Sequence, residues 1–240
     1  MGYFNGLLLL FTIYSFLGWA LETIFASINE KKIINRGFLN GFVCPIYGFG
    51  AILAIQSSKW ISNIFENPFI AIIINIIIAM ILVTVLEYIT GFLLEKIFDC
   101  KWWDYSSNAF NLKGYICLKY SLLWGVLTFL LIKFVHPTIL KVLFLIPTST
   151  KGYLVAILLL YFLTDTVKSV KDTLGLRKVI LNSSNISLNR YYEKIIQYKR
   201  LFIAFPRLLI LNASIINNDI RSVLNDQMDK VKVELKNRFL

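Results

Sequence analysis

Four acidic residues lie within or beside long apolar stretches of the chain, namely Glu22, Glu87, Glu95 and Asp165. A carboxyl group is costly to bury in such surroundings, so it either serves a function or has a hydrogen-bonding partner. Glu87 lies in the middle of its stretch. Its structural interpretation is a hydrogen bond from a tyrosine or from Asn75 on a neighbouring helix, and its functional interpretation is a substrate or coupling position.

The other three acidic residues fall near the end of an apolar stretch, where basic residues also occur. A purely structural role would pair them with cations such as Arg36, Lys96 and Lys168. The functional alternative is a ring of acidic groups that binds a cationic group. The sequence leaves both alternatives open.

A run of aromatic and acidic residues, Trp102-Trp103-Asp104-Tyr105, follows the third apolar stretch. Tryptophan and tyrosine are typical of membrane–water interfaces, where the ring lies at headgroup depth and its polar atom stays hydrated. We therefore expect this run to anchor the chain at the interface. The alternative is an aromatic and acidic lining for a substrate or partner, with Arg36 as the opposing charge. Arg36 and Asn40 lie in the first polar connection and are candidate positions of the same site.

Residues for nucleophilic, metal or phosphate-loop chemistry are scarce. His136 is the one histidine, so no histidine triad or metal cluster can be assembled. The three cysteines, Cys44, Cys100 and Cys117, form no CxxC pair, and no GxxxxGK(S/T) motif occurs. We therefore predict no catalytic residue, no cofactor and no metal site, and we expect any driving ATPase to be another chain.

The composition is typical of a membrane protein. Hydrophobic residues make up 57% of the 240 residues and charged residues only 16%, and the mean hydropathy is +0.67. A helix needs about 20 apolar residues to cross the hydrocarbon core. The candidate stretches are Tyr3–Ile28, Phe42–Ser57, Phe69–Phe98, Tyr115–Val135 and Tyr153–Val170. The predicted fold class is an all-α membrane protein with about five transmembrane helices.

Some segments depart from a plain spanning helix. The second stretch is short and contains Pro45, Gly48 and Gly50, which predicts a broken or partly re-entrant helix. The third is longer than the hydrocarbon core requires, which predicts tilt or an extension beyond it. The segment His136–Ile146 is bounded by two prolines and is too short to span, so we expect a separate interfacial piece.

An internal duplication becomes visible when the sequence is shifted by 73 residues without a gap. Positions 18–47 then match positions 91–120 with ten identities, and Glu22 falls on Glu95. Each copy is a helix, a polar connection and a second helix. The two units span about 3–57 and 76–135. Because both begin on the same side, the repeat is parallel, and the copies should be related by an axis along the membrane normal.

The basic residues are unevenly distributed. From Lys168 onward the chain carries 14 basic and 6 acidic residues, which supply +8 of the net charge of +11. The positive-inside rule places this segment and the connections after the first and third helices in the cytoplasm, and the N-terminus outside. We expect the basic tail to meet anionic lipid rather than nucleic acid. The predicted location is the cell membrane, with several spans.

The C-terminal part has a pattern of its own. We place a transmembrane domain at 1–170 and a basic, helical cytoplasmic tail at 171–240. Apolar residues between positions 220 and 235 fall at helical spacing and predict an amphipathic helix. Upstream, Leu201–Ile216 is apolar but interrupted by a proline and an arginine, which favours a surface-lying helix over a sixth span.

Two segments carry a family resemblance. The first is NRGFLNGFVCPIYGFG at 35–50, and the second is WWDYS at 102–106 followed by NLKGYI at 111–116. They resemble the bacterial integral membrane family of ABC-transporter permeases of type IV. The resemblance covers roughly Gly18–Gly125 and implies a permease-like membrane subunit without an ATPase of its own. It also implies a separate nucleotide-binding ATPase subunit as partner, beside the lipid bilayer.

Other functions stay open on the sequence alone. One is a membrane scaffold or sensor that signals through its tail, and another is an autonomous small transporter. A third is an intramembrane enzyme that uses Glu22 and Glu95, although our prediction is that the protein is no enzyme. A homo-oligomer is neither indicated nor excluded by the sequence.

Overall fold

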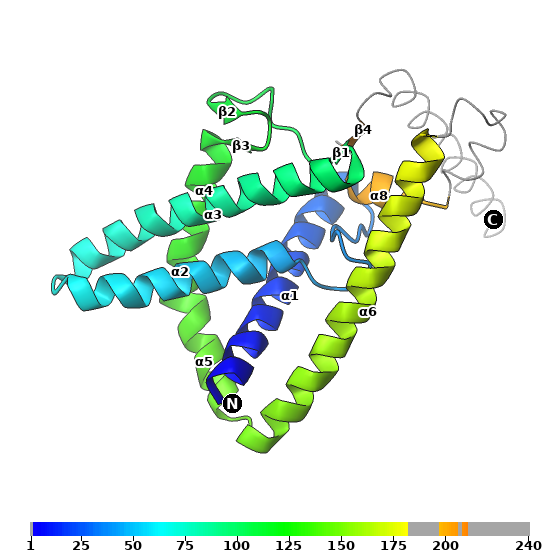
Figure 1. The fold of residues 1–240 in the computed structure, drawn as a ribbon. Coiled ribbons are helices and arrows are strands. Elements are labelled where there is room, and N and C mark those ends of the chain that lie inside the picture. The colour runs from blue at the N-terminus through cyan, green and yellow to red at the C-terminus, as the bar shows by residue number, and fades with distance from the viewer. Residues whose placement is uncertain (1, 182–196, 206–207, 211–240) are drawn as a thin grey trace, which may run out of the picture.

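The protein is mostly helical, and its long apolar helices make it a membrane protein (Figure 1). The computed structural model describes residues 2–181, 197–205 and 208–210. Within these residues, 4 helices are long and apolar enough to cross a membrane. They cover Phe4–Glu30, Pro68–Phe98, Leu118–Phe144 and Thr148–Val179. The long third stretch of the sequence analysis is thus confirmed as one helix of 31 residues.

The long helices are joined by short connections and by one longer folded one. Helix α1 covers Gly2–Glu30, α2 covers Pro45–Ile64 and α3 covers Pro68–Phe98. Helix α4 (Leu118–Leu130), the π turn η1 (Leu131–Val135) and α5 (His136–Phe144) form one rod, and α6 covers Thr148–Leu181. Helices α1 and α2 pack together, α2 packs on α3, and α3 packs on α4.

The expectation of a broken second helix is wrong, because α2 runs unbroken for 20 residues from Pro45. Proline is tolerated at the first turn, where its missing N–H would have no partner anyway. Gly48 does not break the helix but allows a close approach to α1, since a Cβ there would overlap Ser15 Oγ. At the start of α2, the Cys44 amide donates to the Ser15 carbonyl at 2.9 Å.

The segment at His136 is not a separate interfacial piece, which corrects the second expectation. The helix that begins at Leu118 continues through η1 to Phe144. Pro137 donates no backbone hydrogen bond and crowds the carbonyl one turn earlier, which is the carbonyl of Lys133. The wider π turn Leu131–Val135 accommodates this defect without ending the helix.

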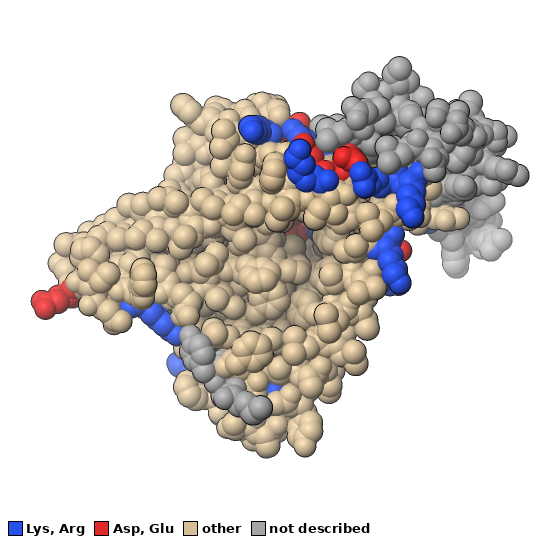
Figure 2. Space-filling model, viewed as in Figure 1, with Lys and Arg blue, Asp and Glu red and all other residues tan. Residues whose placement is uncertain are grey.

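One end of the molecule is closed by folded connections, and we call it the charged end. Strand β1 (Cys100–Lys101) pairs antiparallel with β4 (Leu209–Ile210), and β2 (Asn111–Leu112) pairs with β3 (Ile116–Cys117). The short helix α8 (Lys199–Ala204) lies against them. In Figure 2, lysine, arginine, aspartate and glutamate side chains gather near this end, and the visible helix surfaces below it are almost free of charge.

The core of the charged end joins segments that lie far apart in the sequence. Its buried residues are Phe98, Cys100, Trp102, Leu176, Leu201 and Leu208. They come from the end of α3, β1, the end of α6 and the segment around α8. The part of the tail that the structure describes is therefore packed onto the connection 99–117.

The other end, which we call the opposite end, has a core of its own. It joins the start of α1 to α2, α5 and the start of α6, with Leu9, Leu10, Ile55, Leu143 and Val155 buried. Tyr14 is also buried there, and its hydroxyl lies 2.7 Å from Nδ1 of His136. Between the two ends, many large apolar side chains are exposed, such as Ile81, Leu122 and Leu160. Lipid is the environment that such a surface requires.

Helix α6 continues past position 170 into the predicted tail and ends at Leu181. The apolar run from Leu201 begins with the six-residue helix α8 and strand β4, and not with a sixth span. The rest of that run, at 211–216, and the predicted amphipathic helix at 220–235 lie outside the described residues.

Candidate functional site

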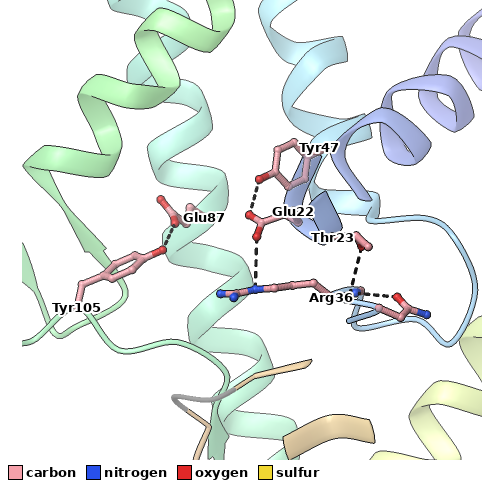
Figure 3. A network of polar contacts seen from close by, with 8 residues as sticks. Glu22, Thr23, Arg36, Tyr47, Glu87 and Tyr105 are labelled. Carbon is pink, nitrogen blue, oxygen red and sulfur yellow. Dashed lines mark hydrogen bonds and ion pairs between the residues drawn. The ribbon is translucent and has the colours of Figure 1, made fainter. Parts of the chain in front are cut away.

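The first part of the candidate site is built on Glu22 of α1. Its Oε1 accepts a hydrogen bond from the Tyr47 hydroxyl at 2.6 Å. Its Oε2 lies 3.4 Å from Nε of Arg36, as Figure 3 shows. Gly18, one turn before Glu22, makes this geometry feasible, because a Cβ there would overlap the Tyr47 ring. The carboxylate therefore ties α1 to α2 and to the connection 31–44.

The second part is built on Glu87 of α3, which is only 4% exposed. Its Oε1 accepts from the Tyr105 hydroxyl at 3.3 Å, and its Oε2 accepts from Nε1 of Trp124 at 2.9 Å. The predicted tyrosine partner is thus found, whereas Asn75 instead lies 2.9 Å from the Ser57 hydroxyl. Burial and the neighbouring carboxylate of Glu87 raise the pKa of Tyr105 well above its usual value. Its hydroxyl therefore keeps the proton that it donates.

The two parts are joined by aromatic rings. The Tyr47 ring packs edge-on against Trp124 with centroids 5.4 Å apart, and Tyr105 stacks on Tyr120 at 4.5 Å. Glu22, Tyr47, Trp124, Glu87 and Tyr105 form one connected set, which we call the carboxylate network. It links α1, α2, α3, α4 and the connection 99–117. A change of charge on either carboxylate would loosen several elements at once.

Asp165 belongs to a different cluster, on α6. Its two oxygens accept the backbone amides of Asn40 at 3.1 Å and Gly41 at 3.0 Å. The side-chain amide of Asn40 lies 3.1 Å from both Ser169 Oγ and Asp172 Oδ2. Among the described residues no ion pair joins Asp165 to Lys168. Asp165 and Asn40 therefore hold the connection 31–44 against α6.

Glu95 differs from Glu22 although the two match in the repeat. Its Oε2 is buried and finds no hydrogen-bond donor among the described residues. Gly91, one turn earlier, faces Tyr115, since a Cβ there would lie 3.1 Å from Tyr115 Cδ1. No described contact joins Glu95 or Asp165 to Glu22. The ring of three acidic residues stays a prediction.

The aromatic run after α3 is not a headgroup anchor throughout, which corrects that expectation for Trp102. Trp102 is 4% exposed and packs against Phe38, Phe98 and Phe205. Nε1 of Trp103 donates to the Tyr115 carbonyl at 2.8 Å. Asp104 accepts from the amide and hydroxyl of Ser106 at 3.1 and 2.6 Å, and so closes a local turn.

Sequence reasoning missed several residues that hold the site. Tyr47 had a signal, because it falls on Tyr120 in the repeat. Trp124 had none, since its contact with Glu87 joins positions 37 residues apart. Tyr105 belongs to the aromatic run of the sequence analysis, but its contact with Glu87, 18 residues away, had no signal. Arg200 also had none, yet its guanidinium donates to the carbonyls of Gly37, Phe38 and Leu39 at 2.9 to 3.1 Å.

One known protein family matches most of the chain. The family "Putative ABC-transporter type IV" matches residues 9–170. The chain belongs to this family. The matched residues contain the whole carboxylate network and Asp165, Asn40 and Ser169 of the second cluster, whereas Asp172, Arg200 and α8 lie beyond the match. No curated protein and no solved structure matches the chain. Within the described residues, no group of three or more histidine, cysteine, aspartate or glutamate side chains could hold a metal ion.

Proposed function

We propose that the protein is the permease-like membrane subunit of an ABC-type transporter and that a separate chain supplies the ATPase. The observation that carries this proposal is the family match over residues 9–170, which includes the apolar helices α3 to α5 and most of α1. The carboxylate network supports it, because intramembrane carboxylates that join several helices suit a protein that changes conformation. We assign the chain no catalytic activity of its own.

The proposed topology has five spans, with α2 as the fifth. Helix α2 has 20 residues, enough to cross the hydrocarbon core, and it packs between α1 and α3. Five crossings put the connections 31–44 and 99–117 and the tail on one side. The excess of basic residues in the tail favours the cytoplasm for that side, and hence a cell-membrane protein with an external N-terminus.

We also propose that α1–α2 and α3–α4 are the two copies of a parallel repeat. The matched residues Cys44 and Cys117 are both N-cap residues, of α2 and α4 respectively. The matched residues Gly18 and Gly91 both face a tyrosine one turn before a glutamate. These local likenesses support the repeat that the sequence predicts.

The charged end is the proposed docking surface for the ATPase. Its connections are held in place by Asp165 and by Arg200, and such fixed loops can transmit a movement of a partner to the helices. Copurification of the full chain in mild detergent tests the proposal. We expect a nucleotide-binding chain to copurify and substrate flux to depend on ATP. If no such chain copurifies and no flux is found under any condition, the permease function is wrong.

The second candidate is a membrane scaffold or sensor that signals through its tail. Arg200 favours it, because this tail residue binds the backbone of the connection 31–44 directly. Truncation after Arg177 distinguishes a sensor from a transporter that works without its tail. A sensor would lose its output, whereas an autonomous small transporter would keep its flux. Joint replacement of Glu22 and Glu95 by Gln tests the remaining enzyme hypothesis, which requires loss of a measured turnover.

A further inference from the structure

A pocket of about 470 Å³ opens between α2, α3 and the rod α4–η1–α5, towards the opposite end of the molecule. It is lined by Ser58 and Ser62 of α2, Ala71 and Asn75 of α3, and Phe129 and Lys133 of the rod. Its volume falls in the range of small-molecule sites. None of the residues of the carboxylate network lines it, so it is a site of its own.

Asn75 supplies a buried polar group to this pocket. The side chain is 4% exposed and shares one interaction with the Ser57 hydroxyl. An amide has two polar atoms, and only one of them faces Ser57. Among the described residues the Ser57 hydroxyl donates to Asn75 Oδ1 at 2.9 Å, and no hydrogen bond from the amide nitrogen is found. Whichever way the amide is turned, one polar atom remains for a ligand.

Two side chains of opposite charge line this pocket but form no ion pair with each other. Lys133 belongs to the π turn η1 and Glu66 to the connection between α2 and α3, and both are exposed. Within the described residues neither forms an ion pair. Turns of the π type recur at functional sites, and this one holds a lysine against the pocket. The rest of the lining is largely apolar, with Phe65, Ile72 and Ile132.

We propose that this pocket binds a zwitterionic molecule with an apolar part. Lys133 and the Asn75 amide would hold its phosphate or carboxylate group, because charge-assisted hydrogen bonds from an ammonium to an anionic oxygen are strong. Glu66 would hold its amino group. The aromatic and aliphatic walls would take the apolar part. A phospholipid with an ethanolamine headgroup and a free hydrophobic amino acid share this chemistry. The proposal does not depend on the proposed function, so failure of one leaves the other standing.

Native mass spectrometry of the full chain in mild detergent tests the site with three probes. Phosphatidylethanolamine carries both charges, phosphatidylglycerol lacks the amine, and leucine is a free zwitterion. The variants are Lys133→Gln and Glu66→Gln, with Lys141→Gln as the matched control. Lys141 is an exposed lysine of α5 that does not line the pocket. Melting temperatures of the variants confirm that each one folds.

We expect wild-type protein to bind phosphatidylethanolamine about tenfold more tightly than phosphatidylglycerol, which is the size expected for one charged hydrogen bond. Lys133→Gln should weaken binding about tenfold. Glu66→Gln should abolish the preference for the amine, and Lys141→Gln should change nothing. Leucine binding with the same response to the variants would support the site and identify a free zwitterion as its ligand. Absence of binding by all probes, or equal binding by wild type and both pocket variants, would overturn the proposal.

Discussion

At the scale of single residues, the main finding is which hydrogen-bond donors Glu87 has. A buried carboxylate is stable only with hydrogen-bond donors, and Glu87 has two, from Trp124 and Tyr105. The sequence indicates that such a partner must exist. It does not identify Trp124, because that choice depends on how α4 packs on α3.

Replacement of Glu87 by Leu should destabilise the protein more than replacement of Tyr105 by Phe. The Leu variant leaves two buried donors unpaired, each at a cost of about 1–3 kcal/mol in the free energy of unfolding. Tyr105→Phe removes one donor together with its bond and should cost only about 1 kcal/mol. Thermal unfolding in detergent measures both. If both variants were as stable as the wild type, the network would contribute nothing to folding.

Cys100 provides a second test at this scale. Its thiol is 2% exposed, and burial together with the neighbouring Asp99 raises its pKa to about 12. The thiolate is the reactive form, so folded protein should resist alkylation at pH 8, and reactivity should rise only as the pH approaches 12. Peptide mass spectrometry after iodoacetamide treatment measures this. Full modification of Cys100 in folded protein at pH 8 would contradict the described burial.

At the scale of elements, the α1–α2 contact explains Gly48, one of two glycines that sequence reasoning took for helix breakers. Gly48 lies where α2 approaches Ser15, whereas Gly50 faces Val83 at an ordinary distance of 3.5 Å for an added Cβ. Composition does not distinguish the two positions, since both are glycines of one short helix. The distinction arises only from the packing of α2 between α1 and α3.

Gly48→Ala and Gly50→Ala should therefore have opposite effects. An added methyl group at Gly48 must displace α1 and should cost about 1–3 kcal/mol of stability. Gly50→Ala should stabilise by up to about 1 kcal/mol, because alanine loses less backbone entropy in a helix. Paired melting curves in the same detergent measure the difference. A greater loss at Gly50 than at Gly48 would mean that α1 and α2 are packed differently.

At the scale of the whole molecule, the sequence predicts the class and most of the architecture. The apolar stretches match α1, α3 and the start of α4, since hydropathy and length are local properties. The burial of Trp102 could not be predicted, because it requires Phe205 of the tail to return to the connection 99–117. The continuation of the α4 helix past Val135 depends on a π turn, for which the sequence pattern gives no signal.

The hydrogen bonds of Arg200 predict that the tail stabilises the charged end. Arg200→Gln removes the guanidinium that binds three carbonyls of the connection 31–44. Hydrogen exchange of the amides at 37–41 should then become about tenfold faster or more, since each charged hydrogen bond contributes about 1.5–3 kcal/mol. Lys199→Gln, an exposed neighbour, is the control. Unchanged exchange in Arg200→Gln would show that the tail does not hold this connection.

Cysteine labelling of intact cells tests the central claim, a five-span protein with its charged end in the cytoplasm. Ile33→Cys and Ser107→Cys place exposed probes in the two connections of the charged end, and Asn63→Cys and Ser149→Cys place them at the opposite end. We predict that a membrane-impermeant maleimide labels the last two in intact cells and the first two only after permeabilisation. Labelling of Ile33→Cys and Ser107→Cys from opposite sides would contradict the account.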